Sequence, residues 1–285
     1  MKTIRLQLQG GLGNQLFIWA MAHELALTNG ARIKLIYVND GIQRLDRPLE
    51  LSDLSKNCEH PISLSQSKIH GLLFRIIDKL TTSNRIMSTA ISSLFGVYTC
   101  QTTYEIPDFG SRPPRILRGF FQDLRMIENN SQIMRTEIGK TLQSLPDTNS
   151  SRGSVILHMR RGDTRKISQA WGVLTDNYYL GIAKDSKKVI ICTDDVTESE
   201  NLARKFPDAK ILTPMDTTTW ETLKILATAK ELVMANSTLS WWAAWLILTQ
   251  LDTKVYFPVP WHPNEVKAFE KLVIPGSIYT VADFE

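Results

Sequence analysis

The sequence predicts an α/β protein of two doubly wound domains. Apolar, strand-forming segments alternate with helical ones, and the strongest polar motifs directly follow strands. This alternation is typical of parallel sheets, whose ligands bind beyond the carboxyl ends of the strands. The 285 residues exceed one typical domain, and segment 146–154 is rich in Pro, Gly, Ser and Asn. We therefore predict an N-terminal domain over 1–148 and a C-terminal domain over 149–285.

The composition is that of an ordinary globular protein, with 43% hydrophobic residues and a net charge of +4. This charge is too small to indicate nucleic acid by itself, and it suits a small anionic ligand. The three cysteines lack CxxC spacing, so neither a disulfide framework nor a zinc site is predicted. Because the sequence has no apolar run of about 18 residues and no signal-peptide pattern, we expect a cytoplasmic protein.

The N-terminal domain begins with a strand, a glycine turn and a helix. A strand pattern covers Ile4 to Leu8, and helical spacing covers Leu16 to Gly30. The intervening Gly10-Gly11-Leu12-Gly13-Asn14-Gln15 lacks the third glycine of a dinucleotide fingerprint and the lysine of a P-loop. Two interpretations stay open: plain turn chemistry, or a loop whose backbone and polar Asn14-Gln15 pair approach an anion.

Further along this domain the pattern predicts a strand over 32–38, a loosely helical stretch over 64–96, a strand over 115–121 and a helix to about residue 145. We interpret the apolar residues of 64–96 as core. The alternative is that they rest on an anionic bilayer surface, together with four basic residues: Lys68, Arg75, Lys79 and Arg85.

The C-terminal domain alternates more regularly, with strands near 155–159, 189–193, 210–212, 232–235 and 255–257. The first of these carries His158, Arg160 and Arg161 to a Gly-Asp turn, which is how a protein presents positive charge to an anion. Neighbours on a strand point to opposite faces, so we expect one arginine to reach a ligand and the other to serve packing or an ion pair. His158 shares a face with Arg160. The alternative is an edge strand with solvated arginines.

Two further strand ends carry polar motifs. Asp194-Asp195 either caps the helical stretch 197–206 or accepts hydrogen bonds from a ribose or a guanine. Asn236-Ser237-Thr238 precedes an apolar helix, and it suits an N-cap and a phosphate site alike. We interpret the tryptophans of that helix, Trp241, Trp242 and Trp245, as packing residues rather than a sugar platform.

In combination, Gly10 to Phe17, His158 to Asp163 and Asn236 to Leu246 resemble the bacterial α-1,2-fucosyltransferases, glycosyltransferase family 11. Supporting matches follow in family order over nearly the whole chain: Arg47 to Leu51, Gly119 to Gln122, Tyr178-Tyr179, Thr193 to Asp195 and Pro258 to Trp261. The departures are Ile18-Trp19 for the usual Gln-Tyr, Met159 for Val or Ile, and Thr164 for Tyr. Segment 31–111 matches poorly, which leaves the acceptor open.

The resemblance implies a GT-B-like fold, with two Rossmann-like domains facing across a cleft and GDP-fucose held mainly by the C-terminal one. It also implies transfer of fucose with inversion to a galactoside hydroxyl in cell-surface glycan or O-antigen synthesis, with no cofactor and no obligatory metal. The acceptor would be a galactose-containing oligosaccharide or lipid-linked glycan, met at the inner face of the inner membrane by a peripherally associated enzyme.

The matched positions imply three catalytic residues, Arg160, His158 and Asn14, of which Arg160 would neutralise the β-phosphate of the leaving group. The donor-binding residues would be Gly13, Gln15, Asp194, Asp195, Asn236, Ser237 and Thr238, and Asp163 would brace Arg161. No catalytic base is assigned. Two other classes remain, a non-catalytic nucleotide or glycan binder on the same fold and a nucleic-acid binder.

Overall fold

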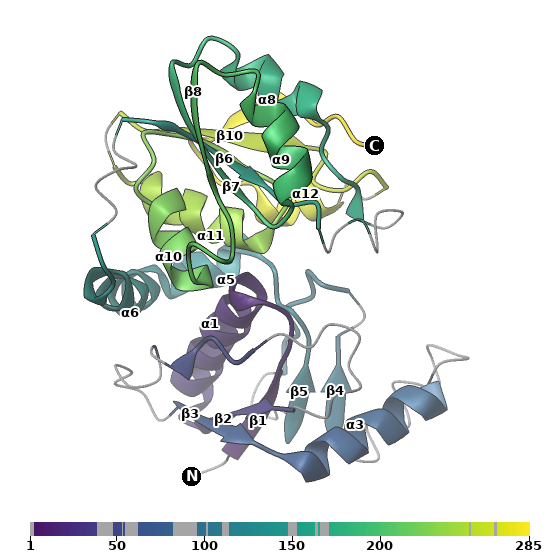
Figure 1. Cartoon of the computed structure of the whole chain (residues 1–285). Helices are drawn as coiled ribbons and strands as arrows, with labels where there is room; N and C mark the ends of the chain where they lie inside the picture. The colour runs from purple at the N-terminus through teal and green to yellow at the C-terminus, as the bar shows by residue number, and fades with distance from the viewer. Residues whose placement is uncertain are drawn as a thin grey trace. The chain divides into compact units, whose positions relative to one another are not determined.

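The computed structural model describes residues 3–38, 48–52, 54, 62–81, 96–100, 102–109, 114–147, 153–162, 165, 171–250, 252–264 and 267–285. The chain divides into two compact units, Met1–Thr141 and Leu142–Glu285. Each unit is built on one parallel β-sheet with helices packed against it (Figure 1). The boundary predicted between residues 148 and 149 lies outside the described residues.

The N-terminal unit has a five-stranded sheet of order β3-β2-β1-β5-β4, in which all neighbours are parallel. The strands are β1 (Thr3–Leu8), β2 (Arg32–Tyr37), β3 (Ile62–Gln66), β4 (Val97–Thr99) and β5 (Ile116–Arg118). The helices are α1 (Leu12–Asn29), α3 (Lys68–Thr81), α5 (Leu124–Asn129) and α6 (Ser131–Ser144).

The longest helix of this unit, α1, is apolar on most sides and almost wholly buried. It ends at Gly30, which adopts the left-handed conformation (φ 55°) that glycine takes at helix C-termini. In contrast, α3 buries one side only. Its Phe74 and Ile77 pack with Ile36, Val97 and their neighbours in a small core cluster. The other side of α3 therefore remains at the surface.

The C-terminal unit has a six-stranded sheet of order β11-β10-β9-β6-β7-β8, again parallel throughout. The strands are β6 (Val155–Met159), β7 (Lys188–Thr193), β8 (Asp208–Leu212), β9 (Glu231–Val233), β10 (Lys254–Val259) and β11 (Ile278–Val281). The helices are α8 (Asp176–Ala183), α9 (Val196–Ala203), α10 (Thr219–Leu226), α11 (Thr238–Ile247) and α12 (Lys267–Leu272).

The central strands β6 and β7 are nearly continuous apolar runs, as expected for parallel strands covered on both faces. Helix α11 is buried almost all round. Its three tryptophans pack in the core, as predicted, with Trp241 and Trp242 fully buried. The indole N–H of Trp241 donates to the carbonyl oxygen of Leu272 at 2.6 Å, so the polar atom of this buried ring is satisfied.

The strand order contains one topological switch point in each unit. From β1 the chain moves outward to β2 and β3, and β5 then pairs with the other side of β1. From β6 it moves outward to β7 and β8, and β9 then pairs with the other side of β6. The connections diverge at these positions, so a crevice is expected beyond the carboxyl ends of β1 and β5, and another beyond β6 and β9.

The fold class is as predicted, and the differences concern single elements. The expected helix over 64–96 is wrong at its start, where β3 forms, because Ile62-Ser-Leu-Ser-Gln66 alternates with period two. The expected single helix to residue 145 is two helices, separated at Asn130. The amide of Asn130 donates to Glu24 Oε2 at 2.8 Å and to the carbonyl oxygen of Met126 at 3.2 Å, which ends α5.

Two further strands were not expected. β4 has only three residues, and β11 is an edge strand whose Val281 is 83% exposed. Hence no burial pattern marks β11 in the sequence. Among the described residues, no helix is both long enough and apolar enough to span a membrane.

Candidate active site

The predicted site residues of the C-terminal unit gather at its switch point. His158 is on β6, Arg160 directly follows β6, and Asn236 to Thr238 connect β9 to α11. β6 and β9 are neighbours in the sheet. The side chain of Ser240, in the first turn of α11, bridges the two strands by contacting Nδ1 of His158. The sheet order thus brings together motifs that lie about 80 residues apart in sequence, as the 82-residue separation of this pair shows.

His158 is held firmly at this switch point. The side chain is 5% exposed, its Nδ1 contacts Ser240 Oγ, and its carbonyl oxygen accepts the hydroxyl of Tyr179 at 2.9 Å. Burial of the imidazole, and secondarily the positive charge of Arg160, lower the pKa of His158 to about 3. The ring is therefore neutral at physiological pH, and it can offer either a hydrogen-bond donor or an acceptor to a ligand.

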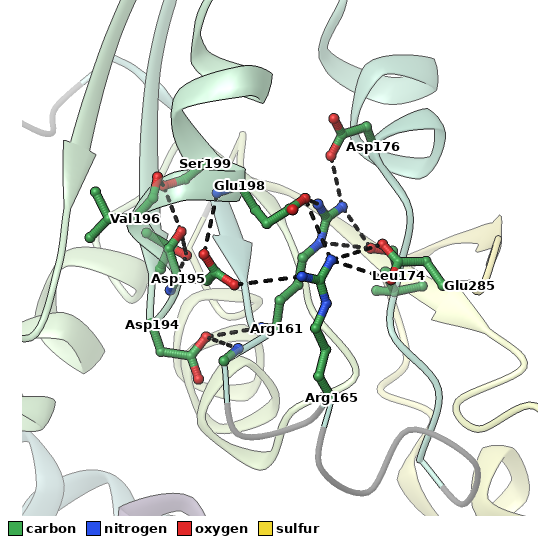
Figure 2. Close-up of polar contacts among 12 residues, drawn as sticks. Arg161, Arg165, Leu174, Asp176, Asp194, Asp195, Val196, Glu198, Ser199 and Glu285 are labelled. Atoms are coloured by element: carbon green, nitrogen blue, oxygen red, sulfur yellow. Dashed lines mark hydrogen bonds and ion pairs between the residues drawn. The ribbon is translucent and has the colours of Figure 1, made fainter.

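Of the two adjacent arginines, Arg161 serves an ion-pair cluster, as expected for one of them, and contact of Arg160 with a ligand stays a prediction. Arg161 is 2% exposed, and its guanidinium lies among carboxylates and a carbonyl: it is 2.8 Å from Asp176 Oδ1, 3.3 Å from Glu198 Oε2, and donates to Leu174 O at 2.8 Å (Figure 2). This is a structural cluster that ties β6 to α8 and α9. Arg160, which directly follows β6, is half-buried and lies close enough to His158 to affect its pKa.

The Asp194-Asp195 pair holds local structure, as Figure 2 shows. Asp194 Oδ1 accepts the backbone N–H groups of Arg161 at 2.9 Å and Gly162 at 3.0 Å. Asp195 is the N-cap of α9 and accepts the N–H of Glu198 at 3.2 Å. The capping alternative is thus confirmed for Asp195. Asp194 fixes the loop after β6, so a direct contact of either carboxylate with a nucleotide stays a prediction.

Gly162 is required by this arrangement. A Cβ atom at Gly162 would lie 2.8 Å from the carbonyl oxygen of Asp194, closer than real Cβ contacts allow. The loop after β6 therefore needs a glycine in order to pack against the end of β7. Asp163, which was expected to brace Arg161, lies outside the described residues. Asp176 and Glu198 take that role among the described residues.

The start of α11 has the features of an anion site. Ser237 is the N-cap, and its Oγ accepts the N–H of Leu239 at 3.3 Å. Thr238 begins the helix and is half-buried. The Asn236 amide donates to the carbonyl oxygens of Trp171 at 2.8 Å and Gly172 at 3.3 Å, so its nitrogen secures a loop. The backbone N–H groups of the first turn and the helix dipole favour a negatively charged ligand here.

The N-terminal unit repeats this design between β1 and β5. The Oδ1 of Asn14, in the first turn of α1, accepts the amide of Gln122, which follows β5, at 2.9 Å. Gly10 (φ 72°) makes this possible, because a Cβ there would lie 2.5 Å from Asn14 Nδ2. Phe121 is buried with a positive φ of 55°, a conformation that a non-glycine residue rarely adopts outside special turns.

The side chain of Gln15 holds a neighbouring loop in place by hydrogen bonds. The side chain is 1% exposed; its amide donates to the carbonyl oxygens of Gly10 and Pro48, both at 2.9 Å, and its Oε1 accepts the N–H of Glu50 at 3.0 Å. Both amide protons are used within the protein, so we assign Gln15 an indirect role in place of the expected donor contact. Gly13 is buried within α1. Arg47, in the matched motif beside this loop, lies outside the described residues.

Sequence reasoning missed several residues of the site. Gln122 was noted only as part of a family match, and nothing in the sequence pairs it with Asn14. Ser240 was interpreted as part of an apolar helix, although its spacing three residues after the N-cap places it over the strand end. Both contacts join segments on either side of a switch point, so only the strand order reveals them.

Two doubly wound α/β units, with a cation and a helix N-terminus at the switch point of the second, are the architecture of the GT-B glycosyltransferases. Over 98% of this chain and 90% of the other, the fold is similar to that of ADP-heptose LPS heptosyltransferase II from E. coli, with a TM-score of 0.51 at 10% identity. The chain belongs to glycosyl transferase family 11, whose family model matches residues 3–259. It is a glycosyltransferase.

Two relatives from Escherichia coli match over almost their full length. An alpha-1,2-colitosyltransferase is 22% identical over 298 aligned positions, covering 93% of this chain and 94% of the relative. The O-antigen biosynthesis glycosyltransferase WbnK is 25% identical, covering 92% of this chain and 95% of the relative. The predicted family, fold class and glycosyltransferase activity are thereby confirmed, and the sugar and acceptor are left to proposal.

Proposed function

We propose that this protein transfers L-fucose from GDP-fucose to a galactoside hydroxyl, forming an α-1,2 linkage with inversion, during O-antigen or related cell-surface glycan synthesis. Membership of family 11 supports the reaction class. The similarity to an alpha-1,2-colitosyltransferase supports an α-1,2 linkage, and the similarity to an O-antigen biosynthesis glycosyltransferase supports an O-antigen acceptor. The observation that carries the proposal is the anion site at the β6–β9 switch point, because the departing group in this reaction is a nucleoside diphosphate.

Each residue of the anion site has a proposed task. Arg160 neutralises the β-phosphate as the bond between C1 of the sugar and the phosphate oxygen breaks. Ser237, Thr238 and the N–H groups of the α11 first turn hold the diphosphate. His158 contacts the same nucleotide from the buried end of β6. Within the N-terminal unit, Asn14 is proposed as a catalytic residue, held by its contact with Gln122, and Gly13 as a donor-binding residue.

The proposal includes no obligatory metal and no cofactor. A diphosphate leaving group requires positive charge or hydrogen-bond donors near its oxygens, and Arg160 with the α11 N-terminus can supply both. Arginine suits this task because its planar fork can bind two phosphate oxygens at once. The acceptor proton is lost late in a dissociative displacement, so the proposal does not assign a base.

A second donor is supported by one specific observation, the similarity to an alpha-1,2-colitosyltransferase. Colitose lacks a hydroxyl group that L-fucose carries at C3, and the two sugars otherwise share the same ring configuration. A site that hydrogen-bonds that hydroxyl discriminates strongly between them, whereas an apolar pocket discriminates weakly. GDP-colitose is therefore the competitor that any donor assay must include.

We also propose that the protein meets its acceptor at an anionic membrane surface through α3. Three apolar side chains on one side of this helix are exposed: Ile69 at 81%, Leu72 at 54% and Ile76 at 43%. Their spacing of three and four residues makes a single stripe, and the exposed Arg75 and Lys79 lie beside it. An apolar stripe flanked by cations complements a bilayer of anionic lipids.

Calorimetric titration tests the donor proposal directly. The purified protein is titrated in EDTA with GDP, GDP-fucose, GDP-colitose, GDP-mannose and UDP-galactose, and transfer to lactose is then measured with each binding donor. We expect binding of GDP and GDP-fucose in EDTA and retention of most transfer activity. Failure of every GDP compound to bind, with and without lactose, would overturn the proposal, and activity that EDTA abolishes and Mn²⁺ restores would overturn the metal-independent part.

A further inference from the structure

Ser240 has two polar partners at the centre of the anion site. It is 0% exposed in the first turn of α11, and its Oγ accepts the backbone N–H of Ala235 at 3.2 Å. The same oxygen contacts Nδ1 of His158, on the neighbouring strand β6. Ser240 therefore connects the end of β9, the start of α11 and the histidine on β6. The sequence gives it no role of its own.

The proton on the serine hydroxyl decides the state of the histidine. A hydroxyl has one proton to donate and two lone pairs. One lone pair of Ser240 Oγ accepts the N–H of Ala235, and among the described residues the hydroxyl proton has one acceptor, Nδ1 of His158. If Nδ1 carried a proton instead, the hydroxyl proton would be buried without a partner, which is unfavourable.

The protonation state of the other ring nitrogen, Nε2, then follows by elimination. A neutral imidazole carries one proton, so an acceptor at Nδ1 places it on Nε2. Burial and the neighbouring positive charge of Arg160 keep the ring neutral, since both lower the pKa of His158. Within the described part of the chain, the ring's hydrogen bond uses Nδ1. Nε2–H is thus the atom that remains to face a ligand.

We infer that Ser240 is a positioning residue that fixes His158 in its Nε2–H form, so that the imidazole donates a hydrogen bond to the anionic donor substrate and does not act as the base. This inference rests on the proposed function for the identity of the ligand. Its first half, the tautomer, concerns the protein alone. A neutral donor beside Arg160 also avoids placing a buried positive charge next to that arginine.

The tautomer can be measured without any substrate. In protein labelled with ¹⁵N-histidine, the chemical shifts of Nδ1 and Nε2 distinguish a protonated from an unprotonated ring nitrogen. We expect the buried His158, assigned by its absence from His158→Gln, to carry its proton on Nε2 from pH 6 to 8. In Ser240→Ala the Nδ1 acceptor loses its donor, and we expect a mixture of tautomers; Ser240→Thr, which keeps the hydroxyl, should restore the single form.

Binding measurements then separate positioning from mere packing. The amide nitrogen of glutamine can occupy the position of Nε2, and that of asparagine the position of Nδ1. We expect His158→Gln to keep GDP affinity within about 5-fold of wild type and His158→Asn to lose on the order of 10-fold or more, the magnitude of one hydrogen bond to a charged group. The two His158 variants still test the donor role of Nε2 if Ser240→Ala fails to fold.

Two results would overturn the inference: a proton on Nδ1 in the wild type, or an unchanged tautomer and GDP affinity in Ser240→Ala. Equal losses in His158→Gln and His158→Asn would remove the donor role of Nε2. If the wild type has the expected tautomer but binds no GDP compound, the proposed function fails while the assignment of Ser240 to the tautomer stands.

Discussion

Two adjacent arginines at the end of β6 have opposite environments. Arg161 is enclosed by Asp176, Glu198 and the carbonyl oxygen of Leu174, and its role is to join strand and helices. Arg160 is half-buried, and its positive charge is close enough to His158 to lower the pKa of that ring. The period of two in a strand predicts this division from sequence. It does not predict which arginine is enclosed, because the carboxylates that enclose Arg161 come from α8 and α9.

Replacement of Arg160 by alanine should lower turnover by on the order of 10²-fold or more, by analogy with the loss of one oxyanion-hole donor. Arg160→Lys should recover part of the loss, because it keeps the charge but not the planar fork. The measurement is transfer from GDP-fucose to lactose under saturating donor. Arg165→Ala is the matched control: this arginine is 39% exposed, pairs with Glu285 at 3.4 Å, and has no proposed part in catalysis.

The control variant should keep near-normal turnover, with a change in thermal stability that stays small because exposed ion pairs contribute about 0–1 kcal/mol. If Arg160→Ala also turns over normally, Arg160 has no part in neutralising the leaving group. Arg161 is unsuitable as a comparison, since its replacement leaves Asp176 and Glu198 without their common partner in a partly buried cluster.

Trp19, which departs from the family pattern, has a hydrogen-bond partner that accounts for the tryptophan at this position. Trp19 stands where family members usually have tyrosine, and its indole N–H donates to Glu137 Oε2 at 2.7 Å. The same oxygen is 3.0 Å from Nε2 of His23, so α1 and α6 are joined by one buried carboxylate. Sequence reasoning identified the departure but not the partner, which lies 118 residues away. Long-range polar pairs of this kind leave no periodic signal.

Two glycines with positive φ flank helix α1: Gly10 lies shortly before its first residue, and Gly30 directly follows its last. Of the two, only Gly10 lies against a residue of the proposed site. At Gly10 a Cβ would meet Asn14, whereas nothing lies within 4 Å of a Cβ at Gly30. Both alanine variants should lose stability by about 1 kcal/mol, since both have positive φ. Gly10→Ala should in addition move Asn14 away from Gln122 and lower turnover by roughly 10-fold to 10²-fold.

Comparison of the two variants separates the effect of backbone strain on stability from the effect on transfer activity. Gly30→Ala should keep turnover close to that of the wild type. Thermal unfolding gives the shared loss of stability, and initial rates with GDP-fucose and lactose give the difference. If the two variants are equally active, the contact between Asn14 and Gln122 does not matter for transfer. The glycine turn at Gly10 could be located from the sequence. Its close contact with the side chain of Asn14 could not.

The exposed stripe of α3 predicts binding to anionic vesicles. Replacement of Ile69, Leu72 and Ile76 together by glutamine should weaken sedimentation with phosphatidylglycerol-containing vesicles by on the order of 10-fold or more, because each side chain gains about 1 kcal/mol or more by burial in the bilayer interface. Binding of the wild type should also fall with added salt, since Arg75 and Lys79 contribute through charge.

Two exposed apolar residues outside α3 provide the control, Met215 at 89% and Val281 at 83% exposure. Their replacement by glutamine removes comparable apolar surface without touching the stripe. If this control binds vesicles as weakly as the α3 variant, or if the α3 variant binds as well as wild type, α3 is not the membrane contact. From the sequence, the apolar residues of this helix could either pack in the core or contact a membrane. The structure shows that Phe74 and Ile77 pack in the core, whereas the residues of the stripe do not.

Both units use the same plan at the scale of the whole molecule. In each, the strand order reverses at a central strand, a helix begins beside the reversal, and one side-chain contact bridges the crevice: Asn14 to Gln122 in one unit, His158 to Ser240 in the other. The alternation of strands and helices predicted the class of fold. The strand order, and hence these bridging contacts, depends on packing between distant segments that no local pattern records.

The C-terminal unit contains two buried histidines whose burial favours the neutral ring, and this predicts sensitivity to acid. Burial lowers the pKa of His158 to about 3 and that of His262 to about 4, in the latter case against the opposing effect of its hydrogen bond to Trp171. In the unfolded chain both have pKa values near 6.5. Below that pH the unfolded state binds more protons than the folded state, so stability is present above about pH 6.5 and is lost as pH falls.

Between about pH 6 and pH 4 the free energy of unfolding should fall by about 2–3 kcal/mol per pH unit, since each histidine contributes up to about 1.4 kcal/mol per unit. Urea unfolding at a series of pH values measures this slope. The double variant His158→Gln, His262→Gln should be less stable at pH 7 but have a much flatter slope, because the groups that bind the extra protons are gone. An equally steep slope in the double variant would mean that other groups, and not these two neutral rings, make the fold sensitive to acid.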